Sequence, residues 1–125
     1  TWHYYYSNGA DSLIENYLMG KKNGISRYFD KSERIIKDVP YLNGLITGIM
    51  ITYYPSGKIK SDFEYKSDRK HGKFNTYYDN GNKEWTGEYV ANRKVGEWIH
   101  CNKSGFPDKK EIYQNNKLLK EENIQ

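Results

Sequence analysis

Few residues in this chain have the type and spacing that catalysis or metal binding requires. The histidines His3, His71 and His100 occupy different positions of a repeating pattern, so a regular sheet would not gather them as metal ligands. His100 and Cys101 are neighbours, and neighbours on a strand point to opposite faces, which argues against a Cys–His nucleophilic pair. Cys101 is the only cysteine, so no intrachain disulfide and no thiol zinc cluster is expected.

Carboxylates are the other candidates for chemistry. Glu64 and Glu88 stand at the same position of successive repeats, just before a tyrosine. Paired carboxylates can transfer protons, but a recurring Glu beside Lys is more simply a cross-strand charge pair on a solvated face. No helix is expected after the glycines, so they do not form a phosphate loop. We therefore predict no enzyme, no catalytic residue, no metal and no cofactor.

A repeat of 24 residues must position all of these side chains. Its markers recur at fixed steps: Gly24, Gly48, Gly72 and Gly96; Gly9, Gly57, Gly81 and Gly105, with Glu33 in the fifth place; and Tyr17, Tyr41, Tyr65, Tyr89 and Tyr113. Of all the glycines, only Gly87 lies outside the repeat positions. The tyrosine series predicts a ladder of rings across a sheet.

Each repeat reads as a β-hairpin. In the clearest copy, aromatic and β-branched residues alternate with polar ones over residues 74–78 and again over 83–90, which predicts two half-buried strands. Residues 79–81 read Asp-Asn-Gly, which predicts a tight turn because Asn and Gly both tolerate a positive φ. Residues 92–96 predict a second, looser polar turn that ends in glycine.

These patterns predict an all-β chain that forms an elongated, curved single antiparallel sheet of about five tandem hairpins. One domain spans residues 1–125, with repeats at 1–23, 24–47, 48–71, 72–95 and 96–119 and a tail at 120–125. The hydrophobic content of 36% is low, whereas 16% of the residues are aromatic, which suits a thin sheet without a deep core. No apolar run is long enough to span a membrane.

Three repeats depart from the pattern. In the second, Tyr28 lies one residue early, which we interpret as a one-residue slip, and Pro40 predicts a sheet edge or a bulge. The third is apolar on both faces, which predicts either a centre covered on both sides or a contact surface. The fifth has weak strand formers over residues 107–110, and residues 118–125 predict a capping strand or a frayed tail.

The pattern G-x-aromatic-x-x-Tyr-Tyr-x-x-Gly, followed by Glu-Tyr and Asn/Asp-Arg-Lys-x-Gly, resembles the MORN repeat, specifically the variant repeat of the YwqK-like bacterial proteins. The best copies are residues 48–72 and 72–96, and weaker copies extend the resemblance over nearly the whole chain. The resemblance implies a fold and supplies no catalytic residue. Members of this group are often labelled antitoxins of toxin–antitoxin systems. Other MORN proteins look like scaffolds, for which lipid and partner binding have been proposed.

The first functional hypothesis is a non-enzymatic scaffold that grips a protein partner through an aromatic-rich sheet face, with a toxin as the partner in the antitoxin version. Its candidate residues are Tyr54, Tyr78, Trp85 and Trp98, because exposed Tyr and Trp are favoured at interfaces. The competing interpretation makes the same aromatic stripe a half-buried core. Open sheet edges leave edge-to-edge dimers as an alternative.

The second hypothesis is a cell-envelope or secreted protein that contacts anionic membrane lipid or a host surface through a basic stripe. The stripe comprises Lys22, Arg69, Lys70, Arg93 and Lys94, which recur in the links between repeats. The competing interpretation is that Lys at exposed turns keeps the sheet soluble and unpaired. The net charge of +4 comes from interleaved charges, so no nucleic-acid partner is expected.

The compartment follows from the hypothesis chosen. An antitoxin would be cytoplasmic, whereas an envelope or secreted protein needs an export signal. The chain starts at Thr1, one residue after the place where a repeat glycine would stand. We interpret this start as processing or trimming, so an export signal or further repeats are expected before it.

Overall fold

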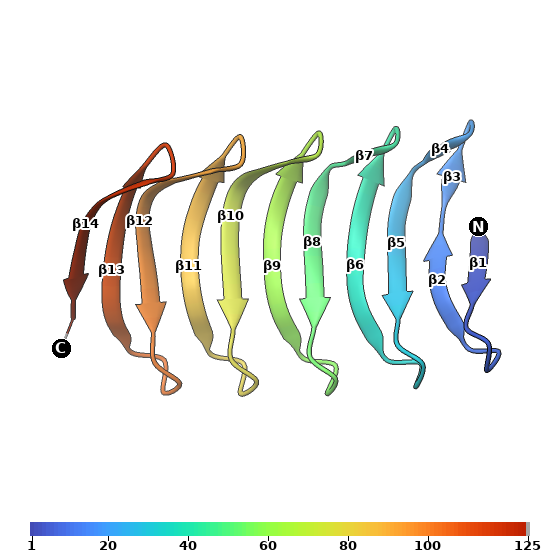
Figure 1. Ribbon diagram of the computed structural model, residues 1–125, viewed down its shortest axis with the longest axis horizontal. Coiled ribbons are helices and arrows are strands. Elements are labelled where there is room, and N and C mark those ends of the chain that lie inside the picture. The colour runs from blue at the N-terminus through green and yellow to red at the C-terminus, as the bar shows by residue number, and fades with distance from the viewer. Residues whose placement is uncertain (125) are drawn as a thin grey trace.

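The computed structural model, which describes residues 1–124, is one open antiparallel sheet with strands in chain order (Figure 1). Twelve strands form the main sheet, and two short strands form a separate pair beside it. The ribbon is elongated, its strands are curved, and the two termini lie at opposite ends (Figure 1). The predicted all-β single sheet is therefore confirmed.

The strands alternate between the first and the return strand of each hairpin. They are β1 (Trp2–Tyr5), β2 (Asp11–Glu15), β3 (Tyr17–Leu18), β4 (Lys21–Lys22), β5 (Gly24–Phe29), β6 (Ile35–Leu42), β7 (Leu45–Ile46), β8 (Gly48–Tyr53), β9 (Ile59–Lys66), β10 (Arg69–Tyr77), β11 (Lys83–Val90), β12 (Arg93–Cys101), β13 (Pro107–Gln114) and β14 (Lys117–Asn123). We call the turns within a repeat hairpin turns and those between repeats links.

The hairpin turns are wider than the sequence predicted. The N–H of Gly81 donates to the carbonyl of Tyr78 (3.0 Å), and the N–H of Tyr78 donates to the carbonyl of Asn82 (2.8 Å). Gly81 has a φ of 91°, but Asn80 is not among the residues with positive φ. The expectation that both residues of the Asn-Gly pair take positive φ is therefore wrong. A single residue with positive φ closes each hairpin turn. In the second repeat this residue is Glu33, with a φ of 66°.

The links are tighter than predicted. Val90 pairs directly with Arg93, so only Ala91 and Asn92 form the turn, with φ values of 48° and 70°. Asn92 then ties the link to the preceding one, because its N–H donates to the carbonyl of Lys70 (2.8 Å) and its Oδ1 accepts from the N–H of Lys70 (2.9 Å). Two other links have the same pair of bonds, from Asp68 to Ile46 and from Asn116 to Lys94.

The glycines that were expected to end the links lie inside strands instead. Gly72 is within β10 with a φ of 115°, and the pairing register of β10 with β9 shifts between Lys70 and Phe74. A residue with a Cβ is disfavoured at this φ, so glycine allows each first strand to kink just after its link.

The second repeat is regular, so the predicted slip is wrong. The register shifts at the same point of every hairpin: Tyr4/Tyr5, Tyr28/Phe29, Thr52/Tyr53, Thr76/Tyr77 and His100/Cys101. Pro40 pairs with Ile25 in the middle of β6, which is an interior strand and not an edge.

Two further expectations are settled by the structure. Ile49 of the third repeat is 55% exposed, so this repeat is not covered on both sides. Residues 107–110 are part of β13, and β14 caps the sheet, so the fifth repeat does not fray there.

The best-buried aromatic side chain depends on the one glycine outside the repeat positions. Trp98 of β12 is 2% exposed, and Gly87 of the adjacent strand lies directly beneath its indole ring. A Cβ at Gly87 would overlap the six-membered part of that ring. Gly87 has an ordinary φ, so its role is to leave room and not to permit a turn.

We expect Gly87→Ala to destabilise the protein by about 1–3 kcal/mol, because the indole must move out of its site. Chemical denaturation followed by circular dichroism measures the change. In a Trp98→Ala background the same substitution should cost much less, since no ring is left to displace. An equal cost in both backgrounds would contradict this account of Gly87.

Candidate functional site: an aromatic face with lysines above its rings

The two faces of the sheet differ in chemistry. Residues that pair directly across strands share a face, and the pairs Phe74–Phe63 and Phe74–Gly87 place an aromatic row on one side. We call this side the aromatic face. The pair Lys73–Glu88 belongs to the other side, which we call the opposite face.

The aromatic face carries a continuous row of rings from β9 to β13. Neighbouring rings have centroids 5.2–6.2 Å apart, within the range of favourable tilted and edge-to-face contacts. The row consists of Phe63, Phe74, Tyr89, Trp98 and Tyr113. Burial raises the pKa of the Tyr89 phenol, which agrees with its place in the row. Of the predicted tyrosine ladder, Tyr89 and Tyr113 belong to this row, and their rings contact Phe74 and Trp98.

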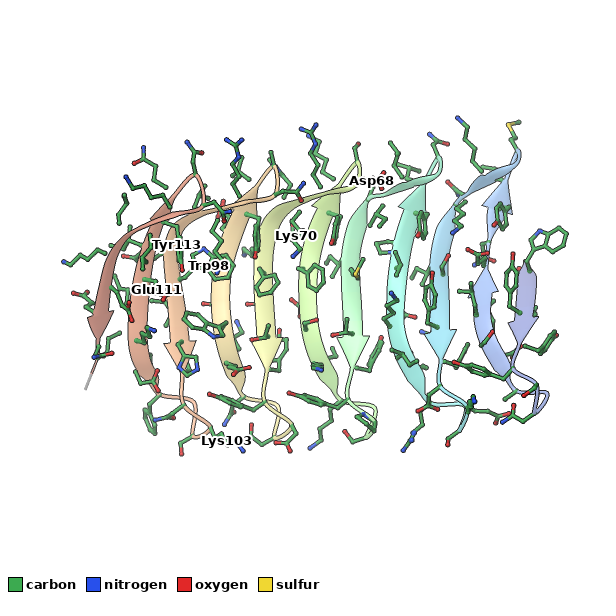
Figure 2. The ribbon with its side chains drawn as sticks, viewed as in Figure 1. Asp68, Lys70, Trp98, Lys103, Glu111 and Tyr113 are labelled. Atoms are coloured by element: carbon green, nitrogen blue, oxygen red, sulfur yellow. The ribbon has the colours of Figure 1, made fainter. Side chains whose placement is uncertain are left out.

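Lysines from the links lie over these rings. Each ammonium covers the tyrosine that follows it by 19 residues, at 4.9, 5.1 and 4.9 Å from the ring centroid. The pairs are Lys22 over Tyr41, Lys70 over Tyr89, and Lys94 over Tyr113. Lys94 also lies 4.7 Å from the centroid of Trp98. Figure 2 shows Lys70, Trp98 and Tyr113 on this part of the sheet, between the link edge at Asp68 and the hairpin-turn edge at Lys103.

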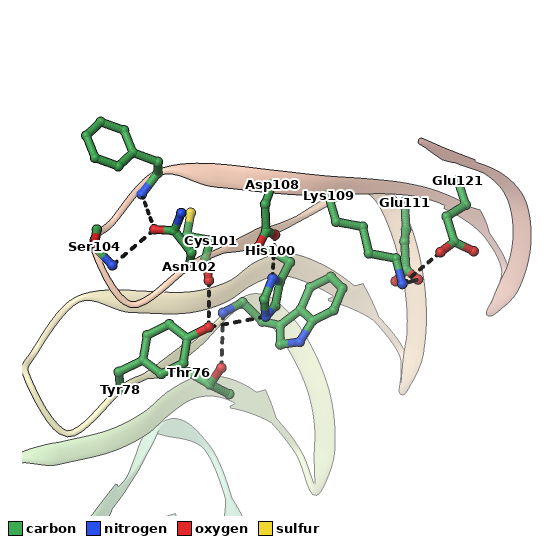
Figure 3. A network of polar contacts seen from close by, with 12 residues as sticks. Thr76, Tyr78, His100, Cys101, Asn102, Ser104, Asp108, Lys109, Glu111 and Glu121 are labelled. Carbon is green, nitrogen blue, oxygen red and sulfur yellow. Dashed lines mark hydrogen bonds and ion pairs between the residues drawn. The ribbon is translucent and has the colours of Figure 1, made fainter. Parts of the chain in front are cut away.

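Carboxylates neutralise lysines only toward the two ends of the aromatic face. Near the N-terminal end, Lys22 pairs with the buried Glu15 at 2.7 Å. Burial alone would raise the pKa of Glu15, but hydrogen bonds from Lys22 and Tyr17 outweigh it and hold that pKa below its usual value. At the C-terminal end, Lys109 pairs with Glu111 at 3.5 Å and with Glu121 at 2.7 Å (Figure 3).

The central lysines have no such partner. Within residues 1–124, neither Lys70 nor Lys94 has a carboxylate oxygen within 4.0 Å of its ammonium nitrogen. Each ammonium has three donors, and contact with a ring face uses none of them in a strong hydrogen bond. The centre of the aromatic face is therefore positively charged.

The four candidate partner-binding residues have different surroundings. Tyr54 and Tyr78 lie at the hairpin-turn edge, where their hydroxyls donate to the carbonyls of Tyr77 (2.6 Å) and Cys101 (2.7 Å) of the next hairpin. Trp85 is half-buried, with its ring 4.9 Å from that of His100. Trp98 is buried, so it supports the face from beneath and offers a partner almost no surface.

A hollow brings two of the candidates together. It has a volume of about 240 Å³ and is lined by Phe74, Thr76, Trp85, Tyr89, Lys94 and Trp98. Trp85 and Trp98 form parts of its wall, whereas Tyr54 and Tyr78 lie outside its lining. The hollow combines aromatic walls, two residues with a hydroxyl (Thr76 and Tyr89) and one ammonium, which is the composition of a small recognition site.

His100 takes part in a polar cluster at the hairpin-turn edge (Figure 3). Its Nδ1 lies 2.6 Å from Asp108 Oδ1, and its Nε2 lies 3.4 Å from the Tyr78 hydroxyl. Tyr78 donates its single proton to the carbonyl of Cys101, so it does not donate that proton to His100. This geometry fastens the fourth hairpin to the fifth and leaves no phenol poised to lose a proton to His100.

The predicted basic stripe is split between two places. Lys22, Lys70 and Lys94 lie over the rings of the aromatic face. Each follows another basic residue (Lys21, Arg69 or Arg93), and successive residues of a strand point to opposite faces. Arg69 and Arg93 stay exposed at the link edge and line a hollow of about 580 Å³. A single stripe of five cations therefore does not form.

The opposite face holds a set of contacts that sequence reasoning missed. Tyr53 donates to Asp38 (3.0 Å), and Tyr77, one repeat later, donates to Asp62 (2.8 Å). Asp38 also receives a two-bond contact from Arg27 (2.8 and 2.9 Å). Burial and the hydrogen bond to Asp62 together raise the pKa of Tyr77 to about 12.

The sequence does carry a signal for these pairs. The positions of Tyr and Asp are 15 residues apart in both repeats. In other repeats the same two positions carry Phe29 with Ile14 and Cys101 with Thr86, so the phenol and the acid are lost together.

Comparison with known proteins adds no assignment, since neither a scan against known protein families nor a search of curated proteins finds a match to this chain. Within residues 1–124, no three His, Cys, Asp or Glu side chains come close enough to hold a metal ion. The same part of the chain contains no helix with the length and apolar character of a membrane span.

The raised pKa of Tyr77 gives a titration test. The fold favours the neutral phenol, so this contribution to stability is complete below about pH 10, the ordinary pKa. It is lost as the pH rises toward about 12. In a ¹³C NMR titration the Tyr77 ring should show its midpoint near pH 12. Asp62→Asn should lower that midpoint, because it removes the acceptor charge; an unchanged midpoint would contradict the role of Asp62.

Proposed function

We propose that the chain is a non-enzymatic scaffold that binds a protein partner through its aromatic face. The observation that carries the proposal is the uncovered hollow, where Trp85 and Thr76 stand beside the ammonium of Lys94. Half-buried aromatic side chains around a small depression are typical of the anchor sites that dominate binding energy. The resemblance to the YwqK-like group supports neutralisation of a toxin as one version of this function.

The structure of the repeat suits this role. Each hairpin contacts chiefly its neighbours, so the sheet extends as a series of similar units and presents a long surface. The opposite face has a different function in this proposal, because its Tyr–Asp pairs are satisfied internally.

We expect Trp85→Ala to weaken partner binding at least tenfold, because the substitution removes the exposed wall of the hollow. A partner is first captured from a lysate of the source organism and identified, and binding of the purified partner is then measured by calorimetry. Lys73→Ala, on the opposite face, is the matched control and should bind normally. Unchanged affinity of a folded Trp85→Ala variant would rule out this face as the binding surface.

A second candidate function rests on the link edge. Arg69 and Arg93 are exposed there, and among the described residues neither guanidinium has a carboxylate partner. Their hollow also includes Asn92 and Asn115, whose amides can donate hydrogen bonds. We propose contact with an anionic lipid or host surface as the alternative function of the molecule.

This alternative predicts binding to vesicles of phosphatidylserine and phosphatidylcholine that falls steeply as salt rises, because exposed charges are screened within about 10 Å at 0.1 M salt. Arg69→Gln with Arg93→Gln should abolish the binding in a sedimentation assay. Lys73→Gln with Lys60→Gln removes the same charge elsewhere and should bind nearly as well. Binding that is absent or insensitive to salt would remove the alternative.

A further inference from the structure

The hollow of the aromatic face is too small for most free ligands. Its volume of about 240 Å³ is below the roughly 300–1,000 Å³ of sites that enclose drug-sized molecules. Its volume is sufficient for one apolar side chain. The geometry therefore favours a segment of a larger partner that inserts a single anchor.

The charge around the hollow selects the segment that carries this anchor. Lys94 lines the hollow, and Lys70 lies one repeat away over Phe74 (5.8 Å) and Tyr89 (5.1 Å). Both lysines are half-buried, and a less polar environment strengthens the attraction of a charge for an approaching anion. A basic segment would be repelled by both groups, and a neutral segment would leave them unpaired after water is displaced.

The two ends of the hollow differ in charge. Lys94 comes from the link side, whereas Glu84 contacts Thr76 Oγ1 at 3.5 Å on the side of the hairpin turn. A carboxylate of the partner is therefore attracted to the link side and repelled from the hairpin-turn side. This polarity places the acids of a bound segment on the link side of the hollow.

The spacing of the lysines sets the spacing of the acids. Lys70 is on β10 and Lys94 on β12, with β11 between them. Two strand separations correspond to about 10 Å. Acidic residues three apart in a polyproline-type segment span about 9 Å, and those seven apart in a helix span about 10.5 Å.

We propose that the partner presents an acidic segment in which two carboxylates contact Lys70 and Lys94 and one apolar or aromatic side chain fills the hollow. This inference rests on the proposed scaffold function and specifies its partner. The lysines toward the ends of the aromatic face cannot bind the acidic segment in this way, because Lys22 is already paired with Glu15 and Lys109 with Glu111.

A random library of 12-residue peptides, displayed on messenger RNA and selected on the immobilised full chain, tests the inference. We expect selected sequences to carry Asp or Glu on both sides of Phe, Trp, Leu or Met. Fluorescence polarisation of a selected synthetic peptide should show at least a tenfold loss of affinity for Lys70→Gln with Lys94→Gln. Lys73→Gln with Lys83→Gln, which removes equal charge from the opposite face, should change affinity less than threefold.

Charge reversal makes the test independent of any loss of stability. The double variant Lys70→Glu with Lys94→Glu should reject the selected peptide and bind its analogue in which each acid is replaced by Lys. Selected sequences that lack acids, failure to select any sequence, or equal binding to the Gln variants would each overturn the inference. Acid-free sequences that still require Trp85 would overturn it and leave the scaffold function standing, whereas sequences indifferent to Trp85→Ala would count against both.

Discussion

A sheet without a covering layer cannot bury a side chain between two layers, and the rest of this structure follows from that constraint. Burial has to come from neighbours on the same face, so rings lie against rings and lysine stems lie over them. Trp98 is the extreme case, since its indole is enclosed by Phe74, Tyr89 and Lys94 around it and by the bare backbone of Gly87 beneath. Aromatic residues suit this task because one ring covers a large area with few rotatable bonds.

The same constraint explains why both edges of the sheet are fastened by polar contacts. A single hairpin is marginally stable in water, so each repeat must be held to the next. At the hairpin-turn edge, hydroxyls such as that of Tyr54 reach the backbone of the following repeat. At the link edge, Asp68, Asn92 and Asn116 each bond twice to the preceding link. Where the tyrosine is replaced by Asp30 or Asn102, the side chain closes its own turn instead.

The polar groups described on the two faces of the sheet are mostly satisfied by their neighbours. The acids of the aromatic face are paired toward its two ends, and the Tyr–Asp pairs of the opposite face are satisfied internally. The central lysines and the hollow beside Trp85 are the exception. In the proposed scaffold function, this positively charged, aromatic depression would discriminate between partners by charge as well as by shape.

The sequence alone determined the period, the all-β class and the antiparallel sheet, because glycine and tyrosine recur at fixed steps and alternation has only one regular interpretation. It did not determine which glycines lie in turns. Gly81 closes a turn, whereas Gly72 lies within strand β10, and both have a positive φ, so the residue type does not distinguish the two positions. It suggested a slip near Tyr28, which the structure corrects. It also suggested an edge or a bulge at Pro40; the strand is interior, and the pairing shifts there, since Asp38 is opposite Ile51 but Tyr41 is opposite Ile46. Trp98 was a candidate for an exposed contact, with a half-buried core as the alternative, and it is buried because Gly87 lies opposite it in the cross-strand arrangement. Likewise, Lys70 and Arg69 are adjacent in sequence. Only the folded strands show that Lys70 lies over the rings of the aromatic face, whereas Arg69 lies at the link edge.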